Sequence, residues 1–486
     1  MATATEVTPS CPPRPALIGT KKGTFAYFTI KDRLPVIITR VVDHVYRTYS
    51  VLPNDVAHAD TIREAKGIIE ALGKLRYEMQ TDKPLTPLLQ DNMGDHLVWN
   101  SIMETYFPQK TWFSATWLFS ECYMYRRIYQ CFSLTTHWRD FDYFAEQKKD
   151  TFHASDRAVA ALADRTLALC QEATMQLDET SRHTAFMELA QASLWGNKTD
   201  LSLLVNLDLA DVHSLQGGEG GHAQDRSSFI VVNHLEAWWA QVRTWSGVRI
   251  DIVLDNSGFE SFVDLVFAHW LVATGYCSKV VFHCKAIPWF VSDTTIPDFH
   301  WLVQTCRDRF QHATHLTNSE HLGGLETLGD QWQDHLMLGR WELRADAFWT
   351  SPYAFWHLPR GTAPVPVNTA GSAANSGPGA SSHTTSSAAL FADLQQNSAA
   401  VIFKGDLNYR KLLYDCEWDL TTPFSTALGP LAQVGTQLPV VSLRTSKCDL
   451  MVGLQPGQGE ELDKRDPKWM VNGKFAVIEV SFPDKA

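Results

Sequence analysis

The sequence has 486 residues, of which 45% are hydrophobic and 20% charged, and this composition excludes an intrinsically disordered chain. Its net charge of -12 and its lack of basic clusters argue against general binding to nucleic acid. A chain of this length exceeds one ordinary hydrophobic core, so we expect two or three domains.

The N-terminal residues and the cysteines indicate a compartment. The first residues, MATATEVTPSCPPRP, lack the charged and apolar regions of a secretory signal. No segment has the roughly 18 uncharged apolar residues that are needed to span a bilayer. The nine cysteines show no C-x-x-C spacing, and most have apolar neighbours, which is typical of reduced, buried thiols. We therefore expect a soluble protein of the cytoplasm, with the nucleus as a second compartment.

The first half of the chain is predicted to be helical. Apolar residues recur at spacings of three and four in the segments 34–49, 60–80, 115–132, 156–177 and 181–195. The third of these segments is apolar nearly all round, which favours a helix inside a bundle. We interpret residues 25–215 as a helical domain that follows an N-terminal extension, residues 1–24.

From residue 216 onward the pattern changes to an α/β domain, residues 216–486. A glycine-rich connection, 216–228, precedes short β-rich runs that alternate with helical ones. The predicted strands are 249–256, 279–290, 400–406, 439–444 and 474–482, and the predicted helices are 259–275 and about 298–312. Strands separated by helices imply right-handed crossovers and a mainly parallel sheet covered on both faces. Residues 361–389, rich in Pro, Gly and Ser, are predicted to be a disordered surface insertion.

Two of these strands lead into candidate metal ligands. Asp255 and Asn256 end the strand 249–256, and their oxygen atoms suit magnesium, manganese or a similar divalent ion. Gly258 would permit a tight turn into the next helix, although a plain turn with an Asp or Asn cap explains the same residues. Asp293 follows the next strand. A lone loop aspartate is usually a cap or turn residue, so this one gains weight only if the sheet places it beside Asp255.

Three further segments carry groups that suit a phosphate or a sugar. The exit of the strand 400–406 is crowded with Lys404, Asp406, Asn408, Tyr409, Arg410 and Lys411. Together these could hold a phosphate and neighbouring hydroxyls, or they could form a solvated helix N-terminus. Arg444 and Lys447 follow the strand 439–444, where a solvent-facing pair is the alternative. Asn197 lies in the run Gly-Asn-Lys-Thr-Asp, which reads first as a helix C-cap and second as a ligand segment.

At these same residues the chain resembles the damage-control phosphatase family, also called the acidic residue methyltransferase family. The matching runs are LWGNKTDLS, LDNSGFE, the Asp293 loop, FKGDLNYRKL and LRTSK. The last run contains an Arg-Thr-x-Lys motif that is similar to that of the sugar-phosphate branch. The resemblance extends from about residue 25 to 482, and the insertion 361–389 departs from it.

The resemblance implies a helical N-terminal domain packed on a three-layer α/β/α, Rossmann-like domain. It also implies hydrolysis of small sugar phosphates such as fructose 1-phosphate and fructose 6-phosphate with manganese, cobalt or nickel, and magnesium is a further candidate. By position, the metal ligands are Asp255, Asn256 and Asp293, and the catalytic residues are Asp255 and Asp406. The residues that match substrate-contacting positions are Asp255, Asn256, Asp406, Leu407, Asn408, Tyr409, Arg410, Lys447 and Asn197.

The mechanism expected from this set is metal-assisted phosphoryl transfer. Lys447 and Arg410 would hold the non-bridging oxygens, and Asp406 would orient the sugar or assist proton transfer. The sequence leaves open whether water or an aspartate attacks, and the lack of a D-x-D-x-T/V motif at the first strand favours water. Methyl transfer from S-adenosylmethionine to protein carboxylates comes second, because no Gly-rich loop suited to that cofactor is evident. A non-catalytic sugar-phosphate sensor is a third hypothesis, and no protein partner is predicted.

Overall fold

The computed structural model describes residues 6–174, 178–196, 228–308, 322–361, 380–381 and 386–483. Asn197, the connection 216–227 and most of the insertion 361–389 lie outside these residues, so the predictions made for them stay predictions. None of the described helices is both long enough and apolar enough to cross a membrane.

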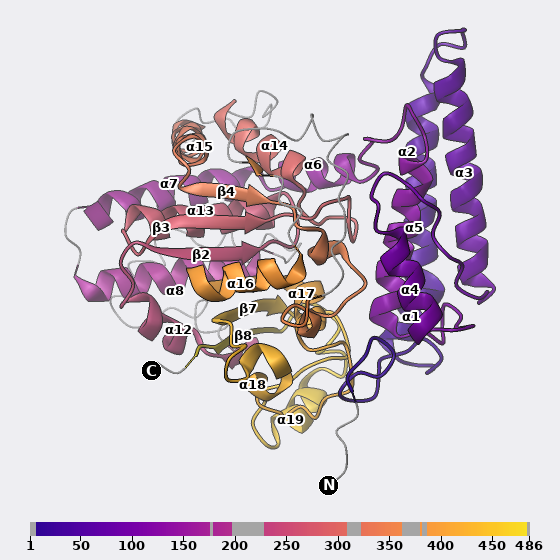
Figure 1. Ribbon diagram of the computed structural model, residues 1–486. Coiled ribbons are helices and arrows are strands. Elements are labelled where there is room, and N and C mark those ends of the chain that lie inside the picture. Colours follow the sequence, from indigo (N-terminus) through magenta and orange to yellow (C-terminus); the bar gives the residue numbers. More distant parts are fainter. Residues whose placement is uncertain are drawn as a thin grey trace.

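The N-terminal part is a group of helices, as predicted. It comprises α1 (Phe25–Phe28), η1 (Thr29–Arg33), α2 (Leu34–Ser50), α3 (Ala59–Gln80), α4 (His96–Tyr106) and α5 (Trp117–Ser133). The long helices α2 and α3 pack side by side as a hairpin that stands next to the sheet (Figure 1). Their buried residues recur at three- and four-residue spacings, which is the pattern that predicted them. Helix α5 is buried on nearly all sides, which confirms its predicted interior place.

The next three helices belong with the sheet rather than with α2 and α3. These are α6 (Ala145–His153), α7 (Asp156–Thr174) and α8 (Glu179–Trp195). Helices α7 and α8 both pack on α13 (Phe259–Ala273), and their apolar residues share one buried cluster with it and with the strands. The predicted domain boundary at residue 215 stays a prediction, but α7 and α8 pack as part of the layer that covers the sheet.

The sheet contains eight strands within the described residues. They are β1 (Ile230–Asn233), β2 (Val248–Val253), β3 (Cys277–His283), β4 (Trp341–Arg344), β5 (Ala380–Ser381), β6 (Ser398–Lys404), β7 (Val440–Thr445) and β8 (Ala476–Ser481). Their order is β1-β8-β7-β6-β2-β3-β4-β5. Strands β7 and β8 are antiparallel, and every other neighbouring pair is parallel, so the predicted mainly parallel sheet is confirmed.

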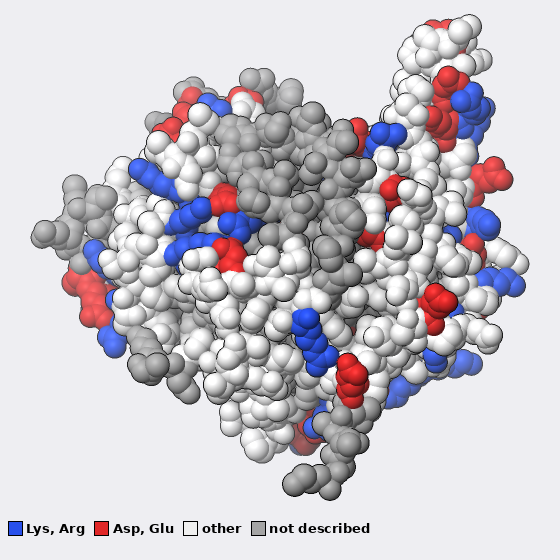
Figure 2. Space-filling view, viewed as in Figure 1, with Lys and Arg blue, Asp and Glu red and all other residues white. Residues whose placement is uncertain are grey.

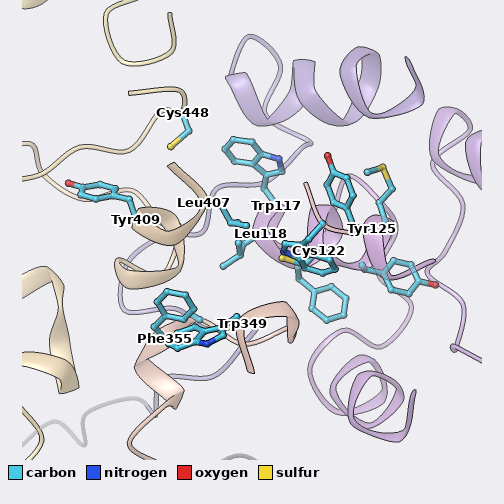
Figure 3. Packing of buried hydrophobic residues seen from close by; sticks show 14 of the residues in the cluster. Trp117, Leu118, Cys122, Tyr125, Trp349, Phe355, Leu407, Tyr409 and Cys448 are labelled. Carbon is cyan, nitrogen blue, oxygen red and sulfur yellow. The ribbon is translucent and has the colours of Figure 1, made fainter. Parts of the chain in front are cut away.

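Helices cover both faces of this sheet, which makes the predicted three layers (Figure 1). One face carries α7, α8, α12 (Leu235–Val242), α13, α14 (Ile296–Arg307) and α15 (Leu322–Met337). The other carries α16 (Ser387–Asn397), α17 (Gly405–Leu412), α18 (Phe424–Ala427) and the short helices η2 (Ala347–Thr350), η3 (Phe355–His357) and η5 (Gly429–Ala432). Helix α19 (Gln458–Arg465) precedes β8. The core of this second face continues into the N-terminal helices, and Figure 3 shows Trp117 and Leu118 of α5 next to Leu407 of α17.

Three strand predictions were wrong at their ends. The strand predicted as 249–256 ends at Val253, so Asp255 and Asn256 lie in the loop that follows it. The strand predicted as 279–290 ends at His283, because the apolar residues beyond it form a loop that packs on α5. In this loop the Phe290 ring stacks on Tyr125 with 4.5 Å between the ring centres. The strand predicted as 400–406 ends at Lys404, since Gly405 has a positive φ of 80° and begins α17. The strands β1, β4 and β5 were not predicted.

Acidic and basic side chains are mixed over the visible face of the molecule (Figure 2). The carboxyl ends of the parallel strands face the N-terminal helices (Figure 1). In an open α/β sheet this edge is the usual place for a ligand. The predicted site residues must therefore be sought between the sheet and the N-terminal helices.

Candidate active site

The loops that follow β2 and β3 lie side by side. Asn256 and Asp293 form an antiparallel bridge, and the Thr294 amide donates to the Asp255 carbonyl oxygen at 2.8 Å. The Thr294 hydroxyl donates to the same oxygen at 3.1 Å. The structure thus brings Asp293 next to the loop of Asp255 and Asn256, from a separate part of the sequence.

The carboxyl groups of Asp255 and Asp293 are both buried, and this makes their charged forms unfavourable. Burial raises the pKa of each carboxyl well above its usual range. The charge of Glu260 raises the pKa of Asp255 further, and Asp255 in turn raises that of Asp293. Lys285 opposes both shifts, and its ammonium lies 3.3 Å from Asp293 Oδ2. Even with Lys285 beside them, burial keeps the charged forms of these carboxyls unfavourable.

The donor set fits a hard divalent cation, with one condition on Asn256. Its side-chain amide now donates to Asp255 Oδ2 at 2.8 Å and to Glu260 Oε2 at 2.7 Å, while its carbonyl oxygen accepts from the Ser292 hydroxyl. A half-turn of the amide would exchange nitrogen and oxygen, and the Ser292 hydroxyl could accept instead. The amide oxygen would then face the carboxylates of Asp255 and Glu260, which its nitrogen now contacts. Within the described residues no group of three or more His, Cys, Asp or Glu suits a metal, so water or substrate would complete the shell.

The loop that carries Asp293 has a strained backbone. Phe290 and Val291 have positive φ values of 43° and 72°, which are rare for any side chain and rarer still for a β-branched one. The Ser257 amide donates to the Ser292 carbonyl at 2.7 Å and so fixes the loop to the first one. Strained backbone conformations of this kind are common at functional sites, where they hold a side chain in a fixed position.

Besides the loops after β2 and β3, the first turn of α17 also belongs to the candidate site. A Cβ atom placed on Gly405 would lie 1.8 Å from Asp255 Oδ2, so only glycine allows this close approach. Asp406 follows, and its Oδ1 accepts from Arg444 Nε at 2.8 Å and from the Lys447 amide at 3.1 Å. Although burial opposes it, the charges of Arg444 and Arg410 lower the pKa of Asp406. Asp406 is therefore an ionised, fixed carboxylate beside Asp255.

Of the two cations predicted to contact substrate, Arg410 and Lys447, Lys447 is the one that lies near the acids. Its charge lowers the pKa of Asp255 and of Glu260, which shows that its ammonium lies within electrostatic reach of both. Asn197 lies outside the described residues. The preceding Gly196 packs against Glu260, since a Cβ on it would lie 3.2 Å from the Glu260 Cα.

The remaining predicted substrate contacts on α17 support the helix rather than face the acids. The Asn408 amide donates to the Lys404 carbonyl at 2.7 Å and to the carbonyl of Leu254 at 3.3 Å. Leu407 is buried in the apolar core, so only its backbone could reach a ligand. The Tyr409 ring packs beneath the Arg444 guanidinium, 4.3 Å from its carbon.

The role predicted for Arg410 needs correction. Its guanidinium pairs with Asp415 at 2.9 and 3.0 Å and with Glu121 Oε2 at 2.6 Å. It also covers the Trp117 ring at 3.7 Å. These contacts engage the group with protein partners, so it does not hold phosphoryl oxygens in this geometry.

Sequence reasoning missed two charged residues of the site, Glu260 and Lys285, and it offered a third, Lys404, as a phosphate ligand rather than as a partner of the acids. Glu260 lies in the quoted run LDNSGFE, but only the first residues of that run were read as ligands. Lys285 was assigned to a strand that ends two residues before it. Lys404 lies 2.8 Å from Asp264 Oδ1 and 3.7 Å from Glu260 Oε1, and it supports the acids from the side of α8 by donating to Ser193 Oγ at 2.8 Å.

Comparison with known proteins gives one consistent result. The model of the damage-control phosphatase ARMT1-like domain matches residues 29–462. The damage-control phosphatase ARMT1 of Mus musculus is 37% identical over 491 residues, covering 96% of this chain and 99% of that protein. The Homo sapiens protein of the same name is 34% identical over 490 residues, covering 96% and 98%. A crystal structure of a DUF89 family protein from Pyrococcus horikoshii is 12% identical with a TM-score of 0.39, covering 94% of this chain and 98% of that one.

Proposed function

Since this chain belongs to the damage-control phosphatase ARMT1-like family, which supports a metabolite-repair phosphatase, we propose that it hydrolyses small sugar phosphates with a divalent metal. Fructose 1-phosphate and fructose 6-phosphate are the substrates that we propose. The metal would be manganese, cobalt or nickel, with magnesium as a further candidate.

The observation that carries the proposal is that segments following three strands place their acidic side chains in one buried region. Asp255 and Asn256 come from the loop after β2, Asp293 from the loop after β3, and Asp406 from the start of α17. Buried carboxyl groups take up protons or gain cationic partners, and a bound metal would be such a partner. A phosphate ester bound at the cation would meet Lys447 and the amides of the first turn of α17.

In this proposal each side chain has one task. Asp255, Asn256 and Asp293 would hold the metal, which when bound neutralises charge on the phosphoryl oxygens. Lys447 would hold a phosphoryl oxygen that the metal does not reach. Asp406 would accept a hydrogen bond from a sugar hydroxyl, because its lowered pKa keeps it ionised and unsuited to donate a proton at neutral pH.

The test is phosphate release from fructose 1-phosphate with added Mn²⁺. We expect Asp255→Asn and Asp293→Asn to lower kcat/KM by roughly 100-fold or more, as loss of a metal ligand or its orientation commonly does. The control is Asp393→Asn, because Asp393 pairs with Arg249 and Arg344 at the start of β2 and the end of β4, away from the acids. Full turnover by Asp293→Asn at limiting Mn²⁺ would exclude Asp293 as a ligand.

The same assay separates the two other hypotheses. Binding of the sugar phosphate without release of phosphate would indicate a sensor. Transfer of a labelled methyl group from S-adenosylmethionine to protein carboxylates would indicate a methyltransferase instead of a hydrolase.

We also propose that the protein works in the cytoplasm, with the nucleus as a second compartment. All nine cysteines are free thiols, and most are buried. For eight of them burial raises the pKa, which makes the thiols unreactive. Free thiols of this kind are typical of reducing compartments. Immunofluorescence of the tagged chain tests this location.

A further inference from the structure

Arg410 lies at the centre of a buried ion triad that joins the sheet to the N-terminal helices. The triad is Glu121 on α5, Arg410 on α17 and Asp415 just beyond α17. All three side chains are at most 4% exposed. Arg410 donates two parallel hydrogen bonds to Asp415 and a third to Glu121, and its flat face covers Trp117. A bidentate, stacked arginine of this kind has a fixed orientation.

The backbone around Asp415 is held in a strained form. Tyr414 and Asp415 have positive φ values of 64° and 47°, and neither is glycine. The Asp415 amide donates to the Arg410 carbonyl at 2.9 Å, and the Asp415 carbonyl accepts from the Leu17 amide at 3.3 Å. The Leu17 carbonyl in turn accepts from the Trp117 amide at 2.8 Å. The N-terminal extension therefore runs between α5 and the turn after α17 and ties the two together.

The other end of α17 touches the metal-ligand candidates. The Gly405 backbone leaves no room for even a methyl group beside Asp255, and Asp406 is fixed by Arg444. Arg410 is one helical turn away from Asp406. Any shift of α17 along its axis would therefore move Asp406 relative to Asp255 by the same amount, because a helix moves as a rigid unit.

We propose that Glu121 and Asp415 are positioning residues that act through Arg410, setting the place of Gly405 and Asp406 against Asp255. The expected loss of turnover rests on the proposed function. The expected change in the position of α17 does not. By this inference the N-terminal helices help to position the site, since Glu121 lies on α5, which packs next to α17 in the shared core (Figure 3).

The chain contains a matched control for this triad. Arg126, also on α5, donates to Asp95 at 2.6 Å and to Asp91 at 2.8 Å, and it covers the Tyr129 ring at 5.6 Å. This second triad has the same composition of one arginine and two acids and is equally buried. It lies wholly within the N-terminal helices, so it stabilises the fold without touching α17.

The experiment compares Glu121→Ala and Glu121→Gln with Asp95→Asn. For each protein we would measure kcat and KM for fructose 1-phosphate with Mn²⁺, and amide hydrogen exchange of peptides that cover 405–412. We expect Glu121→Ala to lower kcat by about 100-fold, the loss that misplacement by roughly 1 Å can cause. Glu121→Gln keeps the volume and one acceptor oxygen, so it should restore most of that loss. Exchange over 405–412 should become faster in Glu121→Ala.

Asp95→Asn should leave kcat and the exchange of 405–412 unchanged, and should speed exchange in α4 and α5 alone. If Glu121→Ala leaves the exchange of 405–412 as it is in the wild type, the positioning role is wrong, whatever the turnover. Equal loss of kcat in Glu121→Ala and Asp95→Asn would also overturn it, because both changes would then act through general stability. A wild type that releases no phosphate would refute the proposed function, while the exchange data would still decide the positioning role.

Discussion

At the scale of the residue, the site depends on one position where no side chain fits. Gly405 combines a positive φ with a distance to Asp255 that excludes a Cβ atom. The apolar strand before it and the charged residues after it were visible in the sequence, but the neighbour that requires glycine is 150 residues away. The same holds for Arg410, whose sequence position indicated a phosphate ligand while its partners Glu121 and Asp415 give it another role.

We predict that Gly405→Ala abolishes metal-dependent turnover and destabilises the protein by a few kcal/mol, because the new methyl group would overlap Asp255 Oδ2 and the backbone would be strained. The control is Gly73→Ala in the exposed part of α3, where nothing lies within 4 Å of an added Cβ. That change should stabilise the protein by roughly 0.5–1 kcal/mol. Thermal unfolding and phosphate release measure both effects. A Gly405→Ala protein with normal turnover would mean that α17 lies farther from Asp255.

At the scale of the element, the helices were better predicted than the strands. Long amphipathic or wholly apolar segments identified α2, α3, α5 and α13, because each repeats its pattern over several turns. The strands β1 and β4 have four residues each and β5 has two, so they are too short to show an alternation. The end of β3 was misplaced because an apolar run has the same appearance in a strand and in a buried loop.

The packing of α13 on α15 predicts a loss of stability in acid. His269 on α13 and His335 on α15 are buried, with 3.0 Å between His269 Nδ1 and His335 Nε2. Burial lowers the pKa of His269 to about 3 and that of His335 to about 4. The unfolded chain therefore binds more protons than the folded one below pH 6.5, so the free energy of unfolding falls as the pH falls. Between pH 7 and pH 5 the fall should be on the order of 2–4 kcal/mol.

Urea unfolding at pH 7 and at pH 5 measures this dependence. The double variant His269→Leu/His335→Leu should show a shallower fall than the wild type, since it removes both titrating groups. His183→Gln is the control, because it removes a histidine that lies beside Glu236 and away from the contact of α13 with α15. Equal slopes in the wild type and the double variant would contradict the prediction.

At the scale of the whole molecule, one apolar core joins the N-terminal helices to one face of the sheet. The carboxyl edge of the sheet faces those helices, so the candidate site lies where the two parts of the chain meet (Figure 1). Binding at this place should therefore stabilise the molecule as a unit rather than one part of it.

We predict that Mn²⁺ raises the unfolding temperature of the whole chain. At about 100 times its Kd a ligand that binds only the folded state adds about 2.7 kcal/mol to the free energy of unfolding. Asp293→Asn should lose this gain, and Asp393→Asn should keep it. Calorimetry with and without Mn²⁺, at matched ionic strength, makes the measurement without any substrate. An equal rise in all three proteins would indicate a metal site elsewhere.

The sequence alone determined the α/β class, the mainly parallel sheet and the residues that stand where strands end. These follow from local patterns of hydrophobicity and from the rule that strands separated by helices run parallel. Only the tertiary structure decided that Asp255 and Asp293 meet, that Gly405 must be glycine and that Arg410 pairs with Glu121. The reason is physical, because a charged side chain takes its role from the partners that folding brings to it, and those partners come from distant parts of the chain.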